Sequence, residues 1–241
     1  MSDATFYNPH KLSSHLEQLE AIEKASLRLV VQAILDYREY AKDIFSAESD
    51  LVADIGEDIT REALDRLGMS RIDRRLFGKV DYKRARYLFL PEYAVRQALF
   101  VDSKAEKVSG ENTATLQTSQ FSLKVRQLRN QKEIEEQGKL PCVLAVGNDL
   151  YITTTIFVKY NYEEEDSGKT LKSIRVTALP NGFLQERYNP TPHDGIWLAG
   201  RNAPTRGEEF RVRLKFASLQ QKAQWRVQTI YVDNEEFEWQ N

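Results

Sequence analysis

The sequence predicts an α/β protein in which helices near the N-terminus cover a mixed β-sheet. Apolar residues recur at helical spacing between about residue 11 and residue 68. After about residue 78, β-branched and aromatic residues gather in short runs that turn residues separate. Apolar residues make up 41% of the 241 residues, which is enough to bury a sizeable core.

The N-terminal helices are indicated by spacing and by the residues at their ends. Ser14 and Glu17 match the pattern of a capping box. Neither Gly nor Pro occurs between residues 11 and 55, where apolar side chains repeat every three or four positions. A second helix is expected from about Asp50 to Leu67, ended by Gly68, a residue that suits the position after a helix.

The remainder of the chain is expected to form strands, one further helical stretch and loops. The runs at 80–90 and 95–104 flank the turn signal Leu90-Pro91-Glu92-Tyr93, which predicts an antiparallel hairpin. Residues 113–137 are expected to be helical. Further strands are expected at 150–162, 171–179, 209–216 and 225–232. We treat residues 1–241 as a single domain, with a helical part at 11–68 and an α/β core at 69–241.

Bulk properties narrow the class of protein. The formal net charge of −2 does not announce a nucleic-acid binder, because binding depends on where the charges lie. The single cysteine, Cys142, lies in an apolar run and is expected to be a buried structural thiol. No run approaches the roughly 20 apolar residues of a membrane span. We therefore expect a soluble cytoplasmic protein, without a membrane partner. The phosphate-binding motif G-x-x-x-x-G-K-[ST] does not occur, so ATP use has no support.

The sharpest chemical signal is the run Phe100-Val101-Asp102-Ser103-Lys104. Alternate side chains of a strand share a face, so Asp102 and Lys104 are expected to point the same way. A hairpin that turns at Pro91 and Glu92 places Asp81 opposite Asp102, with about 5 Å between their Cβ atoms.

Two adjacent carboxylates repel each other, and a cation between them removes this cost. Mg²⁺ suits such a site because it takes oxygen ligands and keeps part of its water shell. A nearby lysine ammonium can hold and polarise a water molecule, which completes the groups needed to hydrolyse a phosphodiester. The alternative is a solvated strand face with ordinary charges, because the triplet D-x-K is common.

This hairpin resembles the core of the PD-(D/E)xK nuclease superfamily, with Val80 where a proline often stands. Between about residues 16 and 232 the chain is similar, in the same order, to the SfiI-like type II restriction endonucleases. The resemblance does not extend over residues 233–241. It is carried by residues 19–45, Asp73-Arg74-Arg75, Val80–Arg84, Val101–Lys104, Thr115-Leu116-Gln117, Arg187–Pro190 and Arg206-Gly207-Glu208.

The resemblance implies a restriction-endonuclease-like core with additional β-hairpins, and a role for each site residue. The side chains of Asp81 and Asp102 and the carbonyl of Ser103 would bind the divalent metal, and Lys104 would complete the catalytic set. Glu57, or its neighbour Asp58, could approach the metal, or could be an ordinary solvated helical acid. The expected activity is Mg²⁺-dependent hydrolysis of double-stranded DNA at a specific site.

Basic residues indicate how DNA would be held and read. Positive charges between residues 71 and 86, including Lys83 and Arg84, would attract phosphates. Arg211 and Arg213 share one face of an expected strand while Val212 and Leu214 can be buried, and an arginine fork matches guanine in the major groove.

The resemblance also bears on the sequence that would be read. In the family, the arginines that match Arg211 and Arg213 read bases of a GGCC block, and Arg201 lies in a similar DNA-facing loop. Thr113 lies in the short run where relatives carry an arginine that contacts DNA. We therefore expect an interrupted palindrome containing G·C pairs, which can differ at one base pair from two GGCC blocks around an unread spacer.

A palindromic site requires a two-fold symmetric dimer in which each subunit cuts one strand. The resemblance adds a homotetramer that engages two sites together. Two alternatives stay open on the residues alone. One is a structure-specific repair or recombination nuclease on the same core, and the other is a DNA-binding regulator without catalytic activity.

Overall fold

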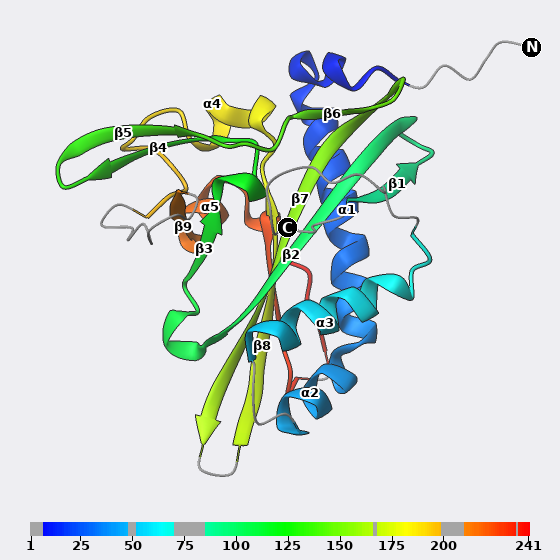
Figure 1. Cartoon of the computed structure of the whole chain (residues 1–241), viewed down its shortest axis with the longest axis vertical. Coiled ribbons are helices and arrows are strands. Elements are labelled where there is room, and N and C mark those ends of the chain that lie inside the picture. Colours follow the sequence, from blue (N-terminus) through cyan, green and yellow to red (C-terminus); the bar gives the residue numbers. More distant parts are fainter. Residues whose placement is uncertain (1–6, 48–51, 70–84, 166–167, 199–209, 235) are drawn as a thin grey trace, which may run out of the picture.

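A computed structural model describes residues 7–47, 52–69, 85–165, 168–198, 210–234 and 236–241. Its centre is a six-stranded sheet in the order β1-β2-β7-β8-β10, with β6 paired to β7 (Figure 1). Strands β2 and β7 run parallel and the other neighbours run antiparallel, so the predicted mixed sheet is confirmed. The strands are β1 (Arg86–Leu90), β2 (Val95–Lys107), β6 (Val143–Val146), β7 (Asp149–Glu165), β8 (Gly168–Leu179) and β10 (Val227–Tyr231).

The first predicted helical stretch forms two helices, α1 (Leu16–Asp36) and α2 (Arg38–Ala47), separated at Tyr37, and the second forms α3 (Val52–Asp65). Gly68 follows α3 with a φ of 64°, as expected of a glycine after a helix. The prediction of a capping box at Ser14 is wrong. Pro9 starts an earlier 3-10 helix, η1 (Pro9–Ser14), in which the Ser14 hydroxyl donates to the carbonyl of Lys11. The residue before α1 is therefore His15, which forms no side-chain cap.

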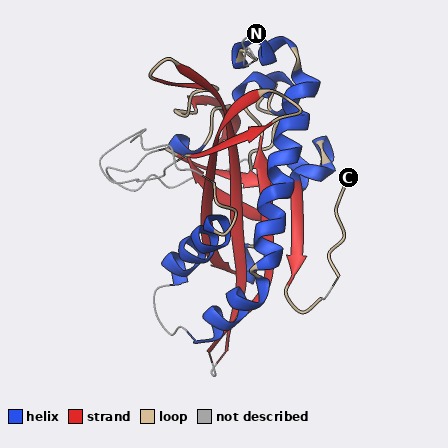
Figure 2. Ribbon diagram, turned by 90° about the vertical axis from the view of Figure 1, so that its right-hand side faces the viewer, coloured by secondary structure: helices blue, strands red, loops and turns tan. Residues whose placement is uncertain are grey.

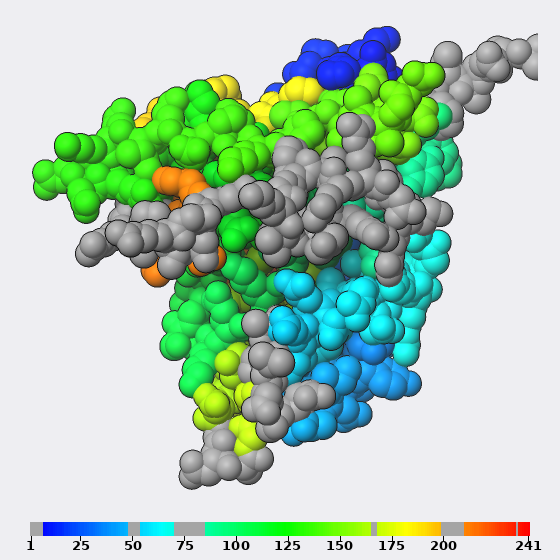
Figure 3. Space-filling model, in the orientation of Figure 1, coloured from blue at the N-terminus to red at the C-terminus, as the bar shows by residue number. Residues whose placement is uncertain are grey.

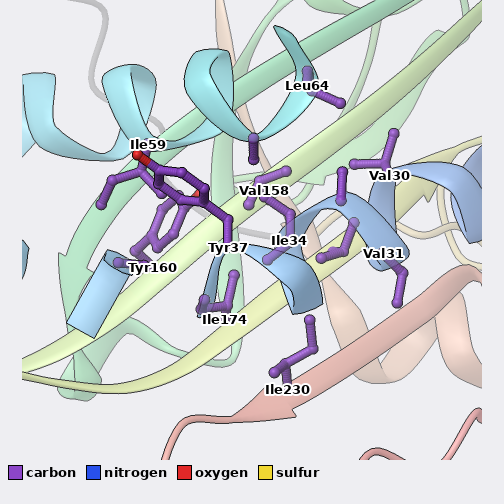
Figure 4. Close-up of a cluster of buried hydrophobic side chains, with 14 of the residues drawn as sticks. Val30, Val31, Ile34, Tyr37, Ile59, Leu64, Val158, Tyr160, Ile174 and Ile230 are labelled. Carbon is purple, nitrogen blue, oxygen red and sulfur yellow. The ribbon is translucent and has the colours of Figure 1, made fainter. Parts of the chain in front are cut away.

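The three helices cover one face of the sheet through a shared apolar core (Figure 4). Figure 2 shows the long helix α1 running along the strands. Ile34 of α1, Ile59 of α3 and Val158 of β7 are each 1% exposed or less. Burial of one such side chain contributes about 1.5–3 kcal/mol, which is why the sheet and the helices form one body.

Helix α3 approaches the backbone of β2 closely at Gly56. A Cβ atom there would lie 3.1 Å from the ring of Tyr160 and 3.4 Å from the amide nitrogen of Ala105. Thr60 and Tyr160 share a buried hydrogen bond of 2.9 Å beside this contact. Helix α3 therefore covers the face of β2 that carries Ala105, opposite to the face of Asp102 and Lys104.

The other face of the sheet carries a second, smaller layer. Strands β3 (Thr113–Gln117) and β9 (Arg211–Lys215) form an antiparallel pair, which we call the β3–β9 ribbon. It packs with η3 (Thr118–Gln120) and α5 (Phe216–Lys222) over a second apolar cluster that includes Phe157 of β7. The remaining short elements are η2 (Val108–Gly110), η4 (Gly182–Leu184), α4 (Gln185–Tyr188) and η5 (Gln224–Arg226).

The prediction of a helix over residues 113–137 is wrong. This stretch forms β3, η3 and a hairpin of β4 (Lys124–Arg129) and β5 (Lys132–Gln137), which stands out from the body in Figure 3. Asn130 and Gln131 both take positive φ angles, 46° and 64°, which close a tight hairpin turn. The alternation of buried Ala114 and Leu116 with polar neighbours has the period of a strand.

The predicted hairpin of β1 and β2 is present, but its register differs by two residues. The expected turn would set Arg86 opposite Gln97, whereas Arg86 pairs with Leu99. Residues 91–94 form the turn, and Ala94 has a φ of 49°. A shift of two residues leaves every side chain on its expected face. Asp81, and its expected pairing with Asp102, lie outside the described residues.

The later strands confirm the sequence prediction. Strands β7, β8, β9 and β10 occupy the four stretches where strands are expected. Cys142 is partly buried, and burial raises the pKa of its thiol, in keeping with a structural role. Within the described ranges, no helix combines the length and the apolar character needed to cross a membrane.

Candidate active site

Asp102 and Lys104 share one face of β2, as the sequence predicts. Asp102 is 6% exposed, and its carboxylate accepts a hydrogen bond from the side-chain amide of Gln120, at the end of η3. The Lys104 ammonium donates to the carbonyl oxygen of Thr115 on β3, at 2.9 Å. Both side chains therefore lie beneath the segment from Thr115 to Gln120.

The strand that carries these residues offers oxygen atoms to a cation. Strand β1 begins at Arg86, opposite Leu99, so among the described residues the part of β2 after Leu99 pairs with β7 alone. Ser103, 4% exposed, lies in this stretch directly after Asp102. A carboxylate and backbone carbonyls are the donors that Mg²⁺ prefers, so the chemistry of this site fits the metal. No group of three His, Cys, Asp or Glu side chains forms a metal site within the described part.

Lys104 belongs to a row of three cations on neighbouring strands. Lys104 pairs in register with Lys159 of β7, which pairs in turn with Arg175 of β8. Lys159 donates to the carbonyls of Gly110 and Thr113, at 2.5 and 2.6 Å, and Arg175 donates to the carbonyl of Glu111. With the bond from Lys104, all three cations hold the chain between residues 110 and 115 above the sheet.

Lys159 is the most buried member of this row. Its side chain is fully buried and forms an ion pair of 2.7 Å with Glu106 of β2. Burial lowers the pKa of Lys159, and the Glu106 carboxylate opposes this shift. Because an unpaired buried ammonium would be costly, the two carbonyls and the carboxylate must stay near Lys159. The start of β3 is therefore held in place over β7.

The β3–β9 ribbon has one polar and one apolar face. Its polar pairs are Thr113 with Lys215, Thr115 with Arg213, and Gln117 with Arg211. Ala114, Leu116, Val212 and Leu214 are 1% exposed or less and face the core, which confirms the prediction for the arginine strand. Arg213 is exposed and Arg211 partly exposed. A two-stranded ribbon of this kind fits the major groove of DNA, with its polar side chains toward the bases.

Other predicted residues are placed elsewhere or lie outside the described ranges. Glu57 is exposed on α3, the helix that covers the face of β2 opposite to Asp102. Its neighbour Asp58 forms an ion pair with Arg61 at 2.8 Å. The predicted site residues Asp81, Lys83, Arg84 and Arg201 lie outside the described residues.

Three residues that the structure brings to this region were not predicted from the sequence. Lys215 continues the period-two pattern of Arg211 and Arg213, so that pattern already contained the signal. Lys159 and Gln120 carry no local signal. Their contacts join segments that are far apart in the sequence, and an isolated lysine or glutamine does not indicate such a partner.

Two solved structures share this fold. The tetrameric restriction endonuclease SfiI bound to cognate DNA superposes with a TM-score of 0.77 and 34% identity, over 93% of this chain and 88% of that chain. The restriction endonuclease BglI bound to its DNA recognition sequence gives a TM-score of 0.74 at 18% identity, over 94% and 95% of the two chains. The fold is therefore that of a restriction endonuclease.

Sequence comparison defines the family within this class. The family model for the type II restriction enzyme SfiI matches residues 35–230. The type II restriction enzyme SfiI of Streptomyces fimbriatus is 38% identical over 232 residues, 90% of this chain and 85% of the relative. The chain belongs to the SfiI family of type II restriction enzymes, and the resemblance seen in the sequence is confirmed.

The buried cation leads to a prediction about stability. Replacing Lys159 with Met leaves two carbonyls and Glu106 without their donor, and hydrogen bonds to a charged group contribute about 1.5–3 kcal/mol each. We expect the free energy of unfolding to fall by about 3 kcal/mol in urea titrations. Lys172→Met is the control, because its ion pair with Glu163 lies at the surface and should contribute less than about 1 kcal/mol. Equal losses in the two variants would contradict the anchoring role.

Proposed function

We propose that this chain hydrolyses phosphodiester bonds of double-stranded DNA at a specific sequence, in a reaction that depends on Mg²⁺. One observation carries the proposal. Asp102 and Lys104 lie beneath the same ribbon whose polar face carries Arg211 and Arg213. Groups suited to cutting and groups suited to reading DNA are thus joined in one unit. The solved relative with 34% identity is bound to cognate DNA, which supports the same substrate class here.

The proposed metal site consists of oxygen donors from β2 and the preceding segment. The carboxylates of Asp81 and Asp102 and the carbonyl of Ser103 would hold the ion, with Glu57 as a supporting acid. Type II restriction enzymes in general need a divalent metal, and an all-oxygen donor set favours Mg²⁺. When bound, the ion neutralises charge that develops on the phosphate and polarises the attacking water.

Lys104 is proposed to orient that water. Its ammonium lies on the face of Asp102, two residues further along β2. In the hydrolysis, the water oxygen bonds to phosphorus while the bond from phosphorus to the leaving sugar oxygen breaks. The water proton passes to solvent, and the leaving oxygen takes up a proton. The ammonium charge stabilises the extra negative charge of this transition state.

The proposed reading surface is the polar face of the β3–β9 ribbon. Arg211 and Arg213 would donate bidentate hydrogen bonds to guanines, with Thr113 on the same face. Arg201 would read from the segment that precedes β9, and Lys83 and Arg84 would contact phosphates near the cut. The site would be an interrupted palindrome containing G·C pairs.

A symmetric assembly follows from such a site. Two subunits related by a two-fold axis would each cut one strand, with residues 1–241 forming one domain. The relative with 34% identity is tetrameric, which supports a homotetramer that holds two sites. We place the enzyme in the cytoplasm, where the DNA that it would cut is found.

Loss of a metal ligand should stop cutting while DNA binding persists. Loss of a group that only orients a metal ligand already lowers activity by about 10- to 100-fold. Loss of the ligand itself, in Asp102→Ala or Asp81→Ala, should therefore lower the cleavage rate by more than about 100-fold. Plasmid digestion with and without Mg²⁺ measures this, with Asp233→Ala as a control at the exposed pair with Lys42. The assignment fails if either variant cuts at a near wild-type rate.

Loss of a reading arginine should relax specificity rather than weaken all binding equally. A bidentate contact contributes about 1–3 kcal/mol of discrimination, so Arg213→Ala should lower the preference for the cognate base by about 5- to 150-fold at one position. End sequencing of digested genomic DNA defines the site, and competition with single-base variants gives the preference. A uniform loss across all duplexes would instead identify Arg213 as a phosphate contact.

A tetramer that needs two sites should cut a plasmid with two sites faster than a plasmid with one. The ratio of initial rates at equal site concentration measures this, and added duplex containing the site should accelerate the one-site reaction. Equal rates on the two plasmids would argue against concerted action. Cutting only of branched DNA would favour a repair nuclease, and metal-independent binding without cutting would favour a regulator.

A further inference from the structure

We infer that Gln120 is a positioning residue, which orients the Asp102 carboxylate for the metal and links it to the β3–β9 ribbon. This inference rests on the proposed function. Gln120 ends the short helix η3 and is 6% exposed. Its amide nitrogen, Nε2, donates to Oδ2 of Asp102, and its amide oxygen, Oε1, accepts from the backbone N–H of Gln117 at 2.7 Å.

The orientation of the Gln120 amide follows from its partners. A backbone N–H can only donate, so the Gln117 amide must face the oxygen of the Gln120 side chain. The nitrogen of that side chain then points to Asp102, which as a carboxylate can only accept. Either partner alone would select this orientation, and the two together hold it.

The same strand connects Asp102 and Lys104 to the two arginines. Gln117, whose N–H binds Gln120, lies opposite Arg211 in the ribbon. Thr115, whose carbonyl accepts from Lys104, lies opposite Arg213. Each proposed catalytic side chain is therefore joined to a ribbon residue that pairs with a proposed base reader. If binding to a non-cognate DNA sequence displaced the ribbon, Asp102 and Lys104 would be displaced together.

Burial makes the bond from Gln120 matter for metal binding. Both Gln120 and Asp102 are 6% exposed, so bulk water cannot readily replace the amide donor. Donation to Oδ2 restricts rotation of the carboxylate and fixes the direction of its other oxygen. Groups that orient metal ligands in this way typically contribute about 10- to 100-fold to metal affinity.

Other contacts hold η3 in place without the Gln120 side chain. The N–H of Thr118 donates to the carbonyl of Phe210, and the N–H of Lys139 donates to the carbonyl of Thr118. Phe121 directly after η3 is fully buried. Removal of the amide group at residue 120 should therefore change the setting of Asp102 and leave the local fold intact.

The test compares Gln120→Met with Gln127→Met in the full-length chain. Methionine has a similar length but no amide group. Gln127, on β4, is 1% exposed, and its side chain has no hydrogen-bond partner among the described residues, which makes it a matched buried control. The readout is Mn²⁺ binding to the DNA-free protein, followed by the electron paramagnetic resonance signal of the free ion.

We expect Gln120→Met to weaken Mn²⁺ binding by about 10- to 100-fold and Gln127→Met to change it less than about twofold. DNA affinity in metal-free buffer should stay at the wild-type value, because the Gln120 side chain bonds to Asp102 and to the backbone N–H of Gln117 rather than to a side chain of the polar face. Gln120→Asn is a second variant, since its shorter amide cannot bridge both partners, and it should also lose affinity. Thermal melting of each variant establishes that it is folded.

Mn²⁺ affinity within about twofold of wild type in both Gln120 variants would overturn the inference. So would a parallel loss of DNA affinity and melting temperature, because that pattern marks a merely structural residue. If the wild-type chain binds Mn²⁺ and cuts DNA, and the Gln120 variants bind Mn²⁺ as tightly as the wild type, this inference alone is refuted. A wild-type chain that neither binds Mn²⁺ nor cuts DNA would refute the proposed function as well.

Discussion

A buried lysine, Lys159, determines where the β3–β9 ribbon lies on the sheet. Its ammonium is fully enclosed and is satisfied by the carbonyls of Gly110, before β3, and Thr113, at the start of β3, and by Glu106. Moving the ribbon away would leave a charge buried without partners, a state far more costly than the loss of one surface contact. Lys104 and Arg175 extend the same bonding to neighbouring strands. The sheet and the ribbon thus form one rigid frame around Asp102.

This frame gives the proposed enzyme a physical link between reading and cutting. A restriction enzyme must cut one sequence and spare many similar ones, so contacts to the bases must influence the groups that cut. Here β3 pairs with the strand of Arg211 and Arg213 through one edge and bonds to Lys104 and Gln120 from its own backbone. Strain at the proposed base contacts would therefore reach Asp102, the proposed metal ligand, through a single strand.

Local patterns in the sequence predicted much of this structure. The helices follow from apolar periodicity, and the shared face of Asp102 and Lys104 follows from the two-residue repeat of a strand. The helix expected at 113–137 was wrong because the strand period of Thr113–Gln117 was overlooked, and the β1–β2 register was wrong because four residues form the turn. Lys159 and Gln120 were not predictable, because each has partners that only the folded chain brings near.

The central claim is that Asp102 binds a divalent cation beneath the ribbon. Anomalous diffraction from a crystal soaked in Mn²⁺ tests it most directly. The account predicts an anomalous peak within coordination distance of an Asp102 carboxylate oxygen, about 2.0–2.3 Å for ions of this kind, with the Gln120 amide still bonded to the same carboxylate. A crystal soaked to saturation in Mn²⁺ that shows no peak at Asp102, or that shows the ion only elsewhere on the chain, would contradict it.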